Sequence, residues 1–404
     1  MSKHSFDQCF HYQFSGVQHV ITIFSSLRVW KLKTMSLKEF VFTVAKMTGL
    51  FNLASYWTSG RLPILCYHGF SLEDEHLFAP GLFMSAELFE KRMRWLKQAG
   101  YQTISLDEAV QRIRDGKLGR KDIVITIDDG FYGVTAIAVP ILKDFGFTAT
   151  IYVTTYYVVN SNPIFGILIR YFFWKTPCKS LVLNDLFSSM EDCTDIKGKL
   201  GPSVAEKIIE FGETQLNRQE RMALARDLAR RLEVDVDGIV STRRFNLMHE
   251  AELADLVSQG FDIQLHTHRH RLPENDIEIK REIGDNRAIL EPITKRPLNH
   301  LCYPSGIWSP ASWPTLEAEG IKTATTCEPG LISNKTPPYA WTRFLDYEST
   351  PQIVFEAEIS GFSHLLRKTF AKCLIKGTGC NSTLKPRHPV SFSRQSLKKP
   401  NKKE

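Results

Sequence analysis

The chain has 404 residues, a hydrophobic content of 43% and a formal net charge of +7. This length suits one large α/β domain or two ordinary domains, and the composition excludes a disordered or membrane-embedded protein. The charge does not indicate nucleic-acid binding, because much of it gathers in a C-terminal tail without an organised set of aromatic residues. The eight cysteines form no CxxC pair, which favours a reducing compartment.

The N-terminal region changes character at Met35. Residues 1–34 have no clear periodicity, whereas Met35 is followed by a capping box, Ser36-Leu-Lys-Glu39. We expect residues 1–34 to be a non-native or disordered extension and Met35 to be the natural start. Residues 35–58 are predicted to form an amphipathic helix, which packs on its own domain or, less commonly, lies on a membrane surface. The sequence shows no signal peptide or membrane-spanning run, so we expect a cytoplasmic or membrane-peripheral location.

Between residues 59 and 368, short apolar runs of strand type alternate with amphipathic helices. This alternation predicts parallel strands in a (β/α) barrel, complete or incomplete. Residues 155–247 interrupt it with an aromatic part and a charged helical part, and we interpret them as an insertion. Its aromatic residues either line a substrate groove or form a small core of their own. Residues 369–404 are predicted to be a disordered basic tail, with contact to an anionic membrane as the alternative.

Two adjacent acids end one of the predicted strands. Residues 123–127 are an apolar run rich in β-branched side chains, and Asp128, Asp129 and Gly130 follow directly. Carboxylates at the end of a buried strand are costly unless a metal, a proton or a hydrogen-bond donor satisfies them. Neighbouring residues on an extended segment point opposite ways, so one acid can bind a metal while the other faces a water or substrate. A simple Asp-Asp-Gly turn is the alternative for this motif taken alone.

A second predicted strand ends in a histidine cluster, His266-Thr-His-Arg-His270. Together with Asp129, His266 and His270 make a set of two histidines and one carboxylate that leaves room for water and substrate. His268 either points away or serves as an alternate ligand. We therefore expect a divalent metal, Zn²⁺ first and Co²⁺ or Ni²⁺ as alternatives.

The same residues suggest a hydrolytic mechanism. A metal lowers the pKa of its bound water towards ~7, and Asp128 is placed to take the proton from that water. The turn at residues 303–306 is expected to supply an oxyanion donor, the backbone N–H of Tyr303.

Three motifs resemble those of the polysaccharide deacetylase family, the carbohydrate esterases with the chitooligosaccharide-deacetylase (NodB) homology domain. Thr126-Ile-Asp-Asp-Gly130 resembles the first motif, T-F-D-D-G, and His266-Thr-His-Arg-His270 matches the second, H-[ST]-x-x-H. Tyr303-Pro-Ser-Gly306 is similar to the Y-P-x-G form of the third. The resemblance covers roughly residues 60–155 and 245–345.

The resemblance implies a deformed (β/α) barrel. It also implies roles for particular residues: Asp128 as the catalytic base, and Asp129, His266 and His270 as metal ligands. Tyr303, Pro304 and Gly306 of the third motif are expected to bind the oxyanion and the substrate.

The chain also departs from the family pattern. Cys302 stands where many members have alanine, and no Leu-x-His motif near the C-terminus supplies the usual catalytic acid. Tyr67-His68-Gly69 resembles a branch of the family in which an N-terminal strand supplies the acid. We therefore predict His68 as the general acid, with a structural histidine as the alternative. Arg343 is expected to orient Asp128.

These features predict a metal-dependent hydrolase that removes N-acetyl groups from amino sugars of a polysaccharide or glycoconjugate. The expected setting is exopolysaccharide, capsule or cell-envelope glycan metabolism, and the expected partner is an acetylated oligo- or polysaccharide. The alternatives are an O-deacetylase of a glycan and a catalytically silent carbohydrate-binding protein of the same fold.

Overall fold

The computed structural model describes residues 36–183, 196–198 and 200–377. These residues form two compact units, one of residues 36–58 and 350–366, the other of residues 59–349 and those from 367 onwards. The first unit consists of four helical segments: α2 (Leu37–Met47), α3 (Leu50–Trp57), α15 (Gln352–Ile359) and the start of α16 (Phe362–Gly377). Among the described residues, no helix is long and apolar enough to cross a membrane.

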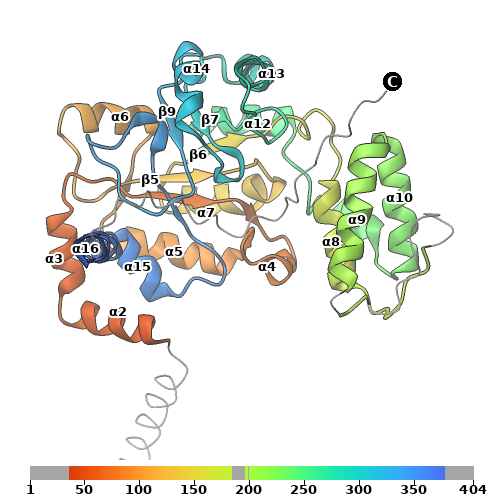
Figure 1. Cartoon of the computed structure of the whole chain (residues 1–404), viewed down its shortest axis with the longest axis horizontal. Helices are drawn as coiled ribbons and strands as arrows, with labels where there is room; N and C mark the ends of the chain where they lie inside the picture. Colours follow the sequence, from red (N-terminus) through yellow and green to blue (C-terminus); the bar gives the residue numbers. More distant parts are fainter. Residues whose placement is uncertain (1–35, 184–195, 199, 378–404) are drawn as a thin grey trace, which may run out of the picture. The chain divides into compact units, whose positions relative to one another are not determined.

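The second unit is built on a parallel sheet of eight strands (Figure 1). Seven strands lie in the order β10-β1-β5-β6-β7-β8-β9, and β4 pairs with β5 beside this path. Their bounds are β1 (Ile64–Tyr67), β4 (Gln102–Thr103), β5 (Asp122–Ile127), β6 (Thr150–Val153), β7 (Asp262–Leu265), β8 (His300–Cys302), β9 (Thr323–Thr325) and β10 (Phe344–Leu345). A small separate pair is formed by β2 (Gly69–Phe70) and β3 (Phe83–Met84).

The sheet curls back on itself through residues 341–345. Trp341 bridges Thr325, the last residue of β9, and its N–H donates to the carbonyl of Ala324 over 3.0 Å. Three residues later the same segment begins β10, which pairs with β1. The predicted deformed (β/α) barrel is therefore confirmed, with its last gap bridged by a short, irregular segment rather than by a full strand.

Helices connect the parallel strands, as crossover topology requires. They are α4 (Glu75–Phe78), α5 (Ala86–Gln98), α6 (Leu106–Arg114), α7 (Val139–Asp144), α12 (Glu250–Ser258), α13 (Asp276–Thr294) and α14 (Trp313–Ala318). A π-helical turn, η1 (Val134–Ala138), leads into α7, and short 3-10 turns are η2 (Pro304–Gly306), η3 (Pro310–Ser312) and η4 (Pro338–Ala340). Ser85 and Ser105 cap α5 and α6 through their side-chain oxygens, as their type and position predict.

The barrel interior is hydrophobic, as strands covered on both faces require. All six residues of β5 and all four of β1 are buried. Charged residues are therefore uncommon in this layer, and those that occur at its ends need partners.

The described part of residues 155–247 contains four helices, α8 (Phe165–Lys175), α9 (Leu200–Gln215), α10 (Arg218–Arg231) and α11 (Val236–Ser241). Tyr171 of α8 packs against Phe78 and Phe245, with ring centroids 5.4 and 5.1 Å apart. Two other residues of α8, Ile167 and Arg170, line the cavity described below. Aromatic residues of the insertion thus pack with one another and with Phe78 of α4, which lies outside the insertion, and α8 also contributes a wall of the cavity.

Several element boundaries differ from the prediction. The expected helix over residues 35–58 is broken at Gly49, whose φ of 81° ends α2 and starts α3. Two helices, α15 and α16, precede the predicted tail, and α16 continues to Gly377, inside the range predicted to be disordered. Residues 1–34 and the rest of the tail lie outside the described residues.

Candidate active site

The predicted site residues meet at the carboxyl ends of the barrel strands. Asp128 and Asp129 follow β5, His68 follows β1, and His266 follows β7. They line a cavity of about 260 Å³. The other lining residues are Phe78, Ala79, Gly81, Leu82, Ile167, Arg170, His270, Tyr303, Ser305, Cys327, Leu345 and Tyr347.

Asp129, His266 and His270 form a set that fits a metal ion. Their ligand atoms all lie within 4.8 Å of one another, and Nε2 of each histidine is 3.2–3.3 Å from Oδ1 of Asp129. That oxygen is buried and accepts no hydrogen bond in the described part of the chain. Two imidazole nitrogens and one carboxylate oxygen are ligands that Zn²⁺ prefers. The residues present therefore fit the divalent metal that the sequence predicts.

Two hydrogen bonds on the side away from Asp129 fix the orientation of His266. Its Nδ1 lies 2.9 Å from the carbonyl oxygen of Cys302, which selects the tautomer with hydrogen on Nδ1 and leaves Nε2 free towards Asp129. Its backbone N–H donates to Oδ1 of Asn286, over 3.0 Å. His268, by contrast, turns away to Thr155 (2.8 Å), so the structure places it outside the ligand set.

The backbone around this set is strained. Asp129, Thr267 and His270 have φ values of 70°, 62° and 52°, in the left-handed region that residues other than glycine seldom adopt. Such strain persists only where surrounding contacts impose it, and it concentrates at functional sites. Here it turns the Asp129 and His270 side chains towards one point.

Asp128 is held by Arg343 rather than by the histidines. The two guanidinium nitrogens Nη1 and Nη2 donate to Oδ1 and Oδ2 over 2.7 and 2.8 Å, and both side chains are buried. Burial alone would raise the pKa of Asp128, but the charge and hydrogen bonds of Arg343 outweigh it and hold that pKa well below its usual range. Asp128 is thus a fixed carboxylate, and Arg343 has the orienting position predicted for it.

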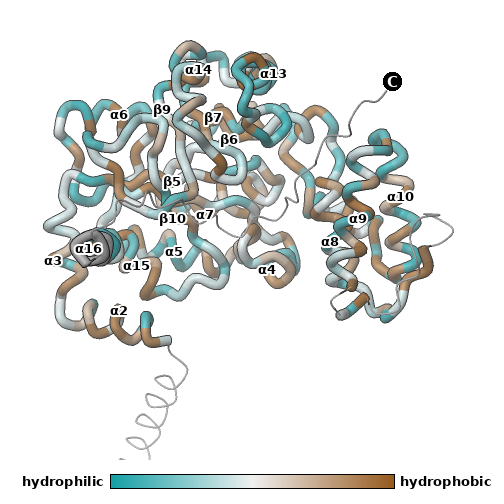
Figure 2. The backbone as a smooth tube through the Cα atoms, in the orientation of Figure 1, coloured by the Kyte–Doolittle hydropathy of each residue, from teal (hydrophilic) through white to brown (hydrophobic). Residues whose placement is uncertain are grey.

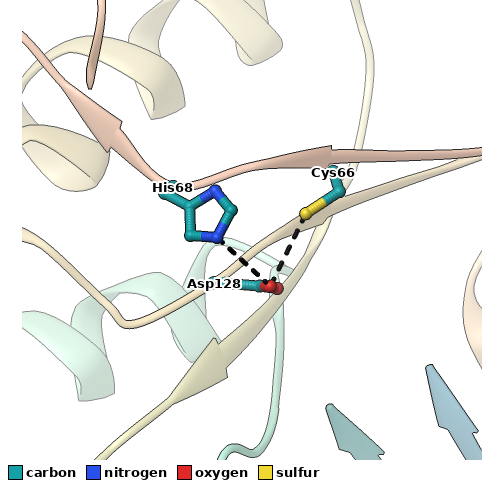
Figure 3. A group of neighbouring side chains, drawn as sticks. All are labelled: Cys66, His68 and Asp128. Atoms are coloured by element: carbon teal, nitrogen blue, oxygen red, sulfur yellow. Dashed lines mark hydrogen bonds and ion pairs between the residues drawn. The ribbon is translucent and has the colours of Figure 1, made fainter. Parts of the chain in front are cut away.

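Two thiols also reach Asp128. The Sγ atoms of Cys66 and Cys302 lie 3.5 and 3.3 Å from its Oδ2. Figure 3 shows Cys66 and His68, two residues apart on the chain, both directed at Asp128. Burial raises the pKa of both thiols, which keeps them protonated as weak donors.

His68 lies on the cavity side of Asp128. Its Nε2 is 3.7 Å from Oδ2 of Asp128, and its side chain is 20% exposed. Burial lowers the pKa of His68, so the ring is neutral near pH 7 and able to accept a proton before donating it. This position suits the acid role predicted from the sequence.

The third motif differs from the expectation in one respect. The backbone N–H of Tyr303 donates to the carbonyl of Thr325 over 3.1 Å, so it is engaged in the sheet. The oxyanion role predicted for this N–H would require that hydrogen bond to open or to be shared, and we do not assign it. Pro304 and Gly306 form the tight turn η2, and Ser305 between them lines the cavity with a φ of 56°.

Comparison with known proteins agrees with this geometry. Residues 235–324 match the family model described as polysaccharide deacetylase. In these residues the chain is similar to the polysaccharide deacetylase family. The matched range includes the second and third deacetylase motifs, whereas the first motif, at residues 126–130, lies before it. The resemblance inferred from the motifs is therefore confirmed.

Individual relatives are more distant. The Bacillus subtilis protein YxkH, whose name gives polysaccharide deacetylase as a provisional assignment, is 38% identical over 93 residues. That match covers 23% of this chain and 31% of the length of YxkH. Two solved structures are also similar to the chain. The Streptococcus pyogenes deacetylase PplD in complex with acetate has a TM-score of 0.48 and 16% identity, covering 73% of this chain and 97% of PplD. IcaB from Ammonifex degensii has a TM-score of 0.46 and 15% identity, covering 75% of this chain and 97% of IcaB.

Sequence reasoning missed part of the deacetylase-type site. The thiol of Cys66 carried a usable signal, because residues two apart on a strand point to the same side and His68 was already predicted. Asn286 gave none, since an asparagine in the middle of a helix is ordinary in sequence. Arg170 lies in the insertion, where no motif indicated which residues would reach the cavity.

Proposed function

We propose that the chain is a metal-dependent hydrolase that removes acetyl groups from the amino groups of sugars in a polysaccharide or glycoconjugate. The proposal rests on one observation: residues suited to proton transfer and residues suited to metal binding line the same cavity. Asp128, held by Arg343 and next to His68, supplies proton transfer. Asp129 lies with two histidines in a set that fits a metal.

Asp129, His266 and His270 would hold the metal, which we propose to be Zn²⁺. When bound, such an ion polarises a carbonyl and makes a neighbouring water more acidic. The remaining chemistry falls to the chain. In the overall reaction, water adds to the acetyl carbonyl, the C–N bond breaks, and acetate and a free amine leave.

Asp128 takes the proton of the attacking water on a carboxylate oxygen. Its low pKa makes it a weak base, but ensures that it is charged and ready at any physiological pH. The proton then passes from Asp128 to the neutral ring of His68, whose Nε2 lies 3.7 Å away, and His68 gives it to the leaving nitrogen, which would otherwise depart as an unstable anion. The two hydrogen bonds from Arg343 keep the Asp128 carboxylate in the same orientation while it gains and loses a proton.

The wider setting stays a prediction. The intact set of Asp128, Asp129 and two histidines argues against a catalytically silent carbohydrate-binding protein. An O-deacetylase would use the same residues, so only the choice of substrate, and not the geometry of the site, distinguishes it from an N-deacetylase. A role in exopolysaccharide, capsule or cell-envelope glycan metabolism is likewise proposed from the family alone.

The test is acetate release from N-acetylated chitooligosaccharides and, separately, from an O-acetylated oligosaccharide. We expect release from the N-acetylated substrate, and Asp128→Asn should reduce it by about 10²–10⁴-fold while metal content is kept. Full activity of Asp128→Asn would remove Asp128 from the mechanism. Release from the O-acetylated substrate alone would establish the O-deacetylase instead.

A further inference from the structure

A patch of large apolar side chains is exposed on α2 and α3. We call it the outer face, and it consists of Leu37, Phe40, Val41, Val44, Met47, Leu50, Leu53, Tyr56 and Trp57. Leu37 and Met47 are 80% and 82% exposed, and Trp57 is 65% exposed. Elsewhere in the described residues such side chains are scattered over several elements: Leu77, Val159, Trp174, Val182, Leu200, Ile277 and Ile307. Exposed apolar side chains are therefore concentrated on the outer face, and chance exposure of single residues does not explain this.

The outer face is a second apolar side of these helices. Their inner side is already filled, because Phe42 and Phe51 are buried and pack against the ring of Phe362, with centroids 5.7 and 5.1 Å apart. Brown stretches mark the hydrophobic residues along α2 in Figure 2. A helix that is apolar on opposite sides is typical of one covered from both. Something in addition to α15 and α16 therefore covers α2 and α3.

The chemistry of the outer face suits the surface of a bilayer. Tyr56 and Trp57 are the side chains enriched where membrane meets water, since one end of each ring system is apolar and the other polar. Neither α2 nor α3, with 11 and 8 residues, is long enough to span a bilayer. Helices of this kind lie in the interface and bury their apolar side among the lipid headgroups.

Charge favours an anionic membrane. Residues 378–404, which follow α16, carry seven Lys and Arg and one acid. The chain as a whole has 51 Lys and Arg against 44 acids, so most of its net positive charge lies in this C-terminal segment. Basic residues near an anionic surface are attracted to it, and the attraction weakens as salt is added.

We infer that the outer face docks on a membrane surface rich in anionic phospholipid, with the basic C-terminal segment adding electrostatic attraction. Apolar burial and charge act together, because either signal alone gives weak and reversible binding. The inference does not depend on the reaction proposed above. It predicts a protein whose outer face lies on a membrane surface.

The test is co-sedimentation of the full chain with vesicles of phosphatidylcholine alone and of phosphatidylcholine mixed with phosphatidylglycerol. We expect binding to the mixed vesicles, weakened but not abolished by high salt. The triple variant Leu37→Ser, Met47→Ser, Trp57→Ser should bind them at least about tenfold more weakly, since three large apolar contacts are lost.

A matched control removes equally exposed apolar residues elsewhere, through Leu77→Ser, Leu200→Ser and Ile277→Ser. It should bind as the unchanged protein does, and circular dichroism should show both triple variants folded. Equal loss of binding in the two triple variants would overturn the inference, as would no binding of the unchanged protein to mixed vesicles. A dimer that forms through the outer face without vesicle binding would assign that face to a second copy of the chain.

Discussion

The buried contacts of Asp128 decide what this site can do. A carboxylate among apolar strands is costly, and two guanidinium hydrogen bonds make it tolerable. The same contacts orient the group towards the cavity. The sequence alone predicted Asp128 and Arg343 as partners. It did not predict the thiols of Cys66 and Cys302: the position of Cys66 two residues before His68 was a usable signal, whereas the weak S–H donor of Cys302 left none.

Arg343 has two roles that substitution can test: it stabilises the fold, and it orients the Asp128 carboxylate. Arg343→Met should lower the free energy of unfolding by about 3–5 kcal/mol, because it leaves the buried Asp128 carboxylate without its partner. It should also lower kcat, since the carboxylate is no longer aimed. Urea unfolding and acetate release measure the two effects.

Arg92→Met is the control for this variant. Arg92 forms a second fully buried pair, with Asp346, through bonds of 2.9 and 3.2 Å. Arg92→Met should lower the free energy of unfolding about as much as Arg343→Met does, but the folded variant should lose much less kcat. Equal loss of kcat in Arg92→Met and Arg343→Met would mean that the effect is structural only.

The low pKa of Asp128 predicts a dependence of stability on pH. A carboxyl whose pKa is lower in the folded state than its usual 3.8 stabilises the fold above that value. This contribution is lost as the pH falls below about 4 and the unfolded chain takes up the proton first. Between roughly pH 5 and pH 3, the free energy of unfolding of the metal-free protein should therefore fall more steeply than that of the metal-free Asp128→Asn variant. Parallel curves for the two proteins would contradict the low pKa.

At the scale of elements, regular structure was predictable and irregular structure was not. The strands before Asp128 and His266, and the serine-capped helices α5 and α6, follow from apolar periodicity and capping residues. The bridging role of residues 341–345 was not predictable, because this segment pairs with one neighbour at its start and another at its end. The helices of the insertion depend on mutual packing, which periodicity only partly encodes.

The tight approach of η1 to β2 gives a prediction at this scale. A Cβ added at Gly133 would lie 2.1 Å from the carbonyl oxygen of Phe70, and that backbone directly follows Gly69 and the proposed acid His68. Gly133→Ala should destabilise the fold by about 1–3 kcal/mol through this clash. Thermal unfolding measures the change.

Gly284→Ala is the matched control for Gly133→Ala. Gly284 lies inside α13, where an added Cβ meets nothing within 4 Å. This variant should stabilise the protein by about 0.5–1 kcal/mol, as alanine does in place of glycine in a helix. A neutral Gly133→Ala would show that the backbone of β2 moves freely away from η1.

At the scale of the whole molecule, parallel strand order explains why residues 200 positions apart form one site. The carboxyl ends of β1, β5, β7 and β8 lie at one end of the barrel, so the residues after them meet there. The motifs therefore predicted which residues meet, although not the contribution of α8 to the cavity wall. The outer face, too, was visible only as helical periodicity, and its exposure required the packed structure.

The most direct test of the central claim is acetate release from N-acetylated chitooligosaccharides by the purified full chain, with bound metal quantified in the same sample. The sample is measured as purified, after chelation, and after Zn²⁺ is restored. We predict about one metal per chain, loss of release on chelation and its return with Zn²⁺, because Asp129, His266 and His270 form one ligand set. Release that continues unchanged from chelated, metal-free protein would contradict the proposed reaction.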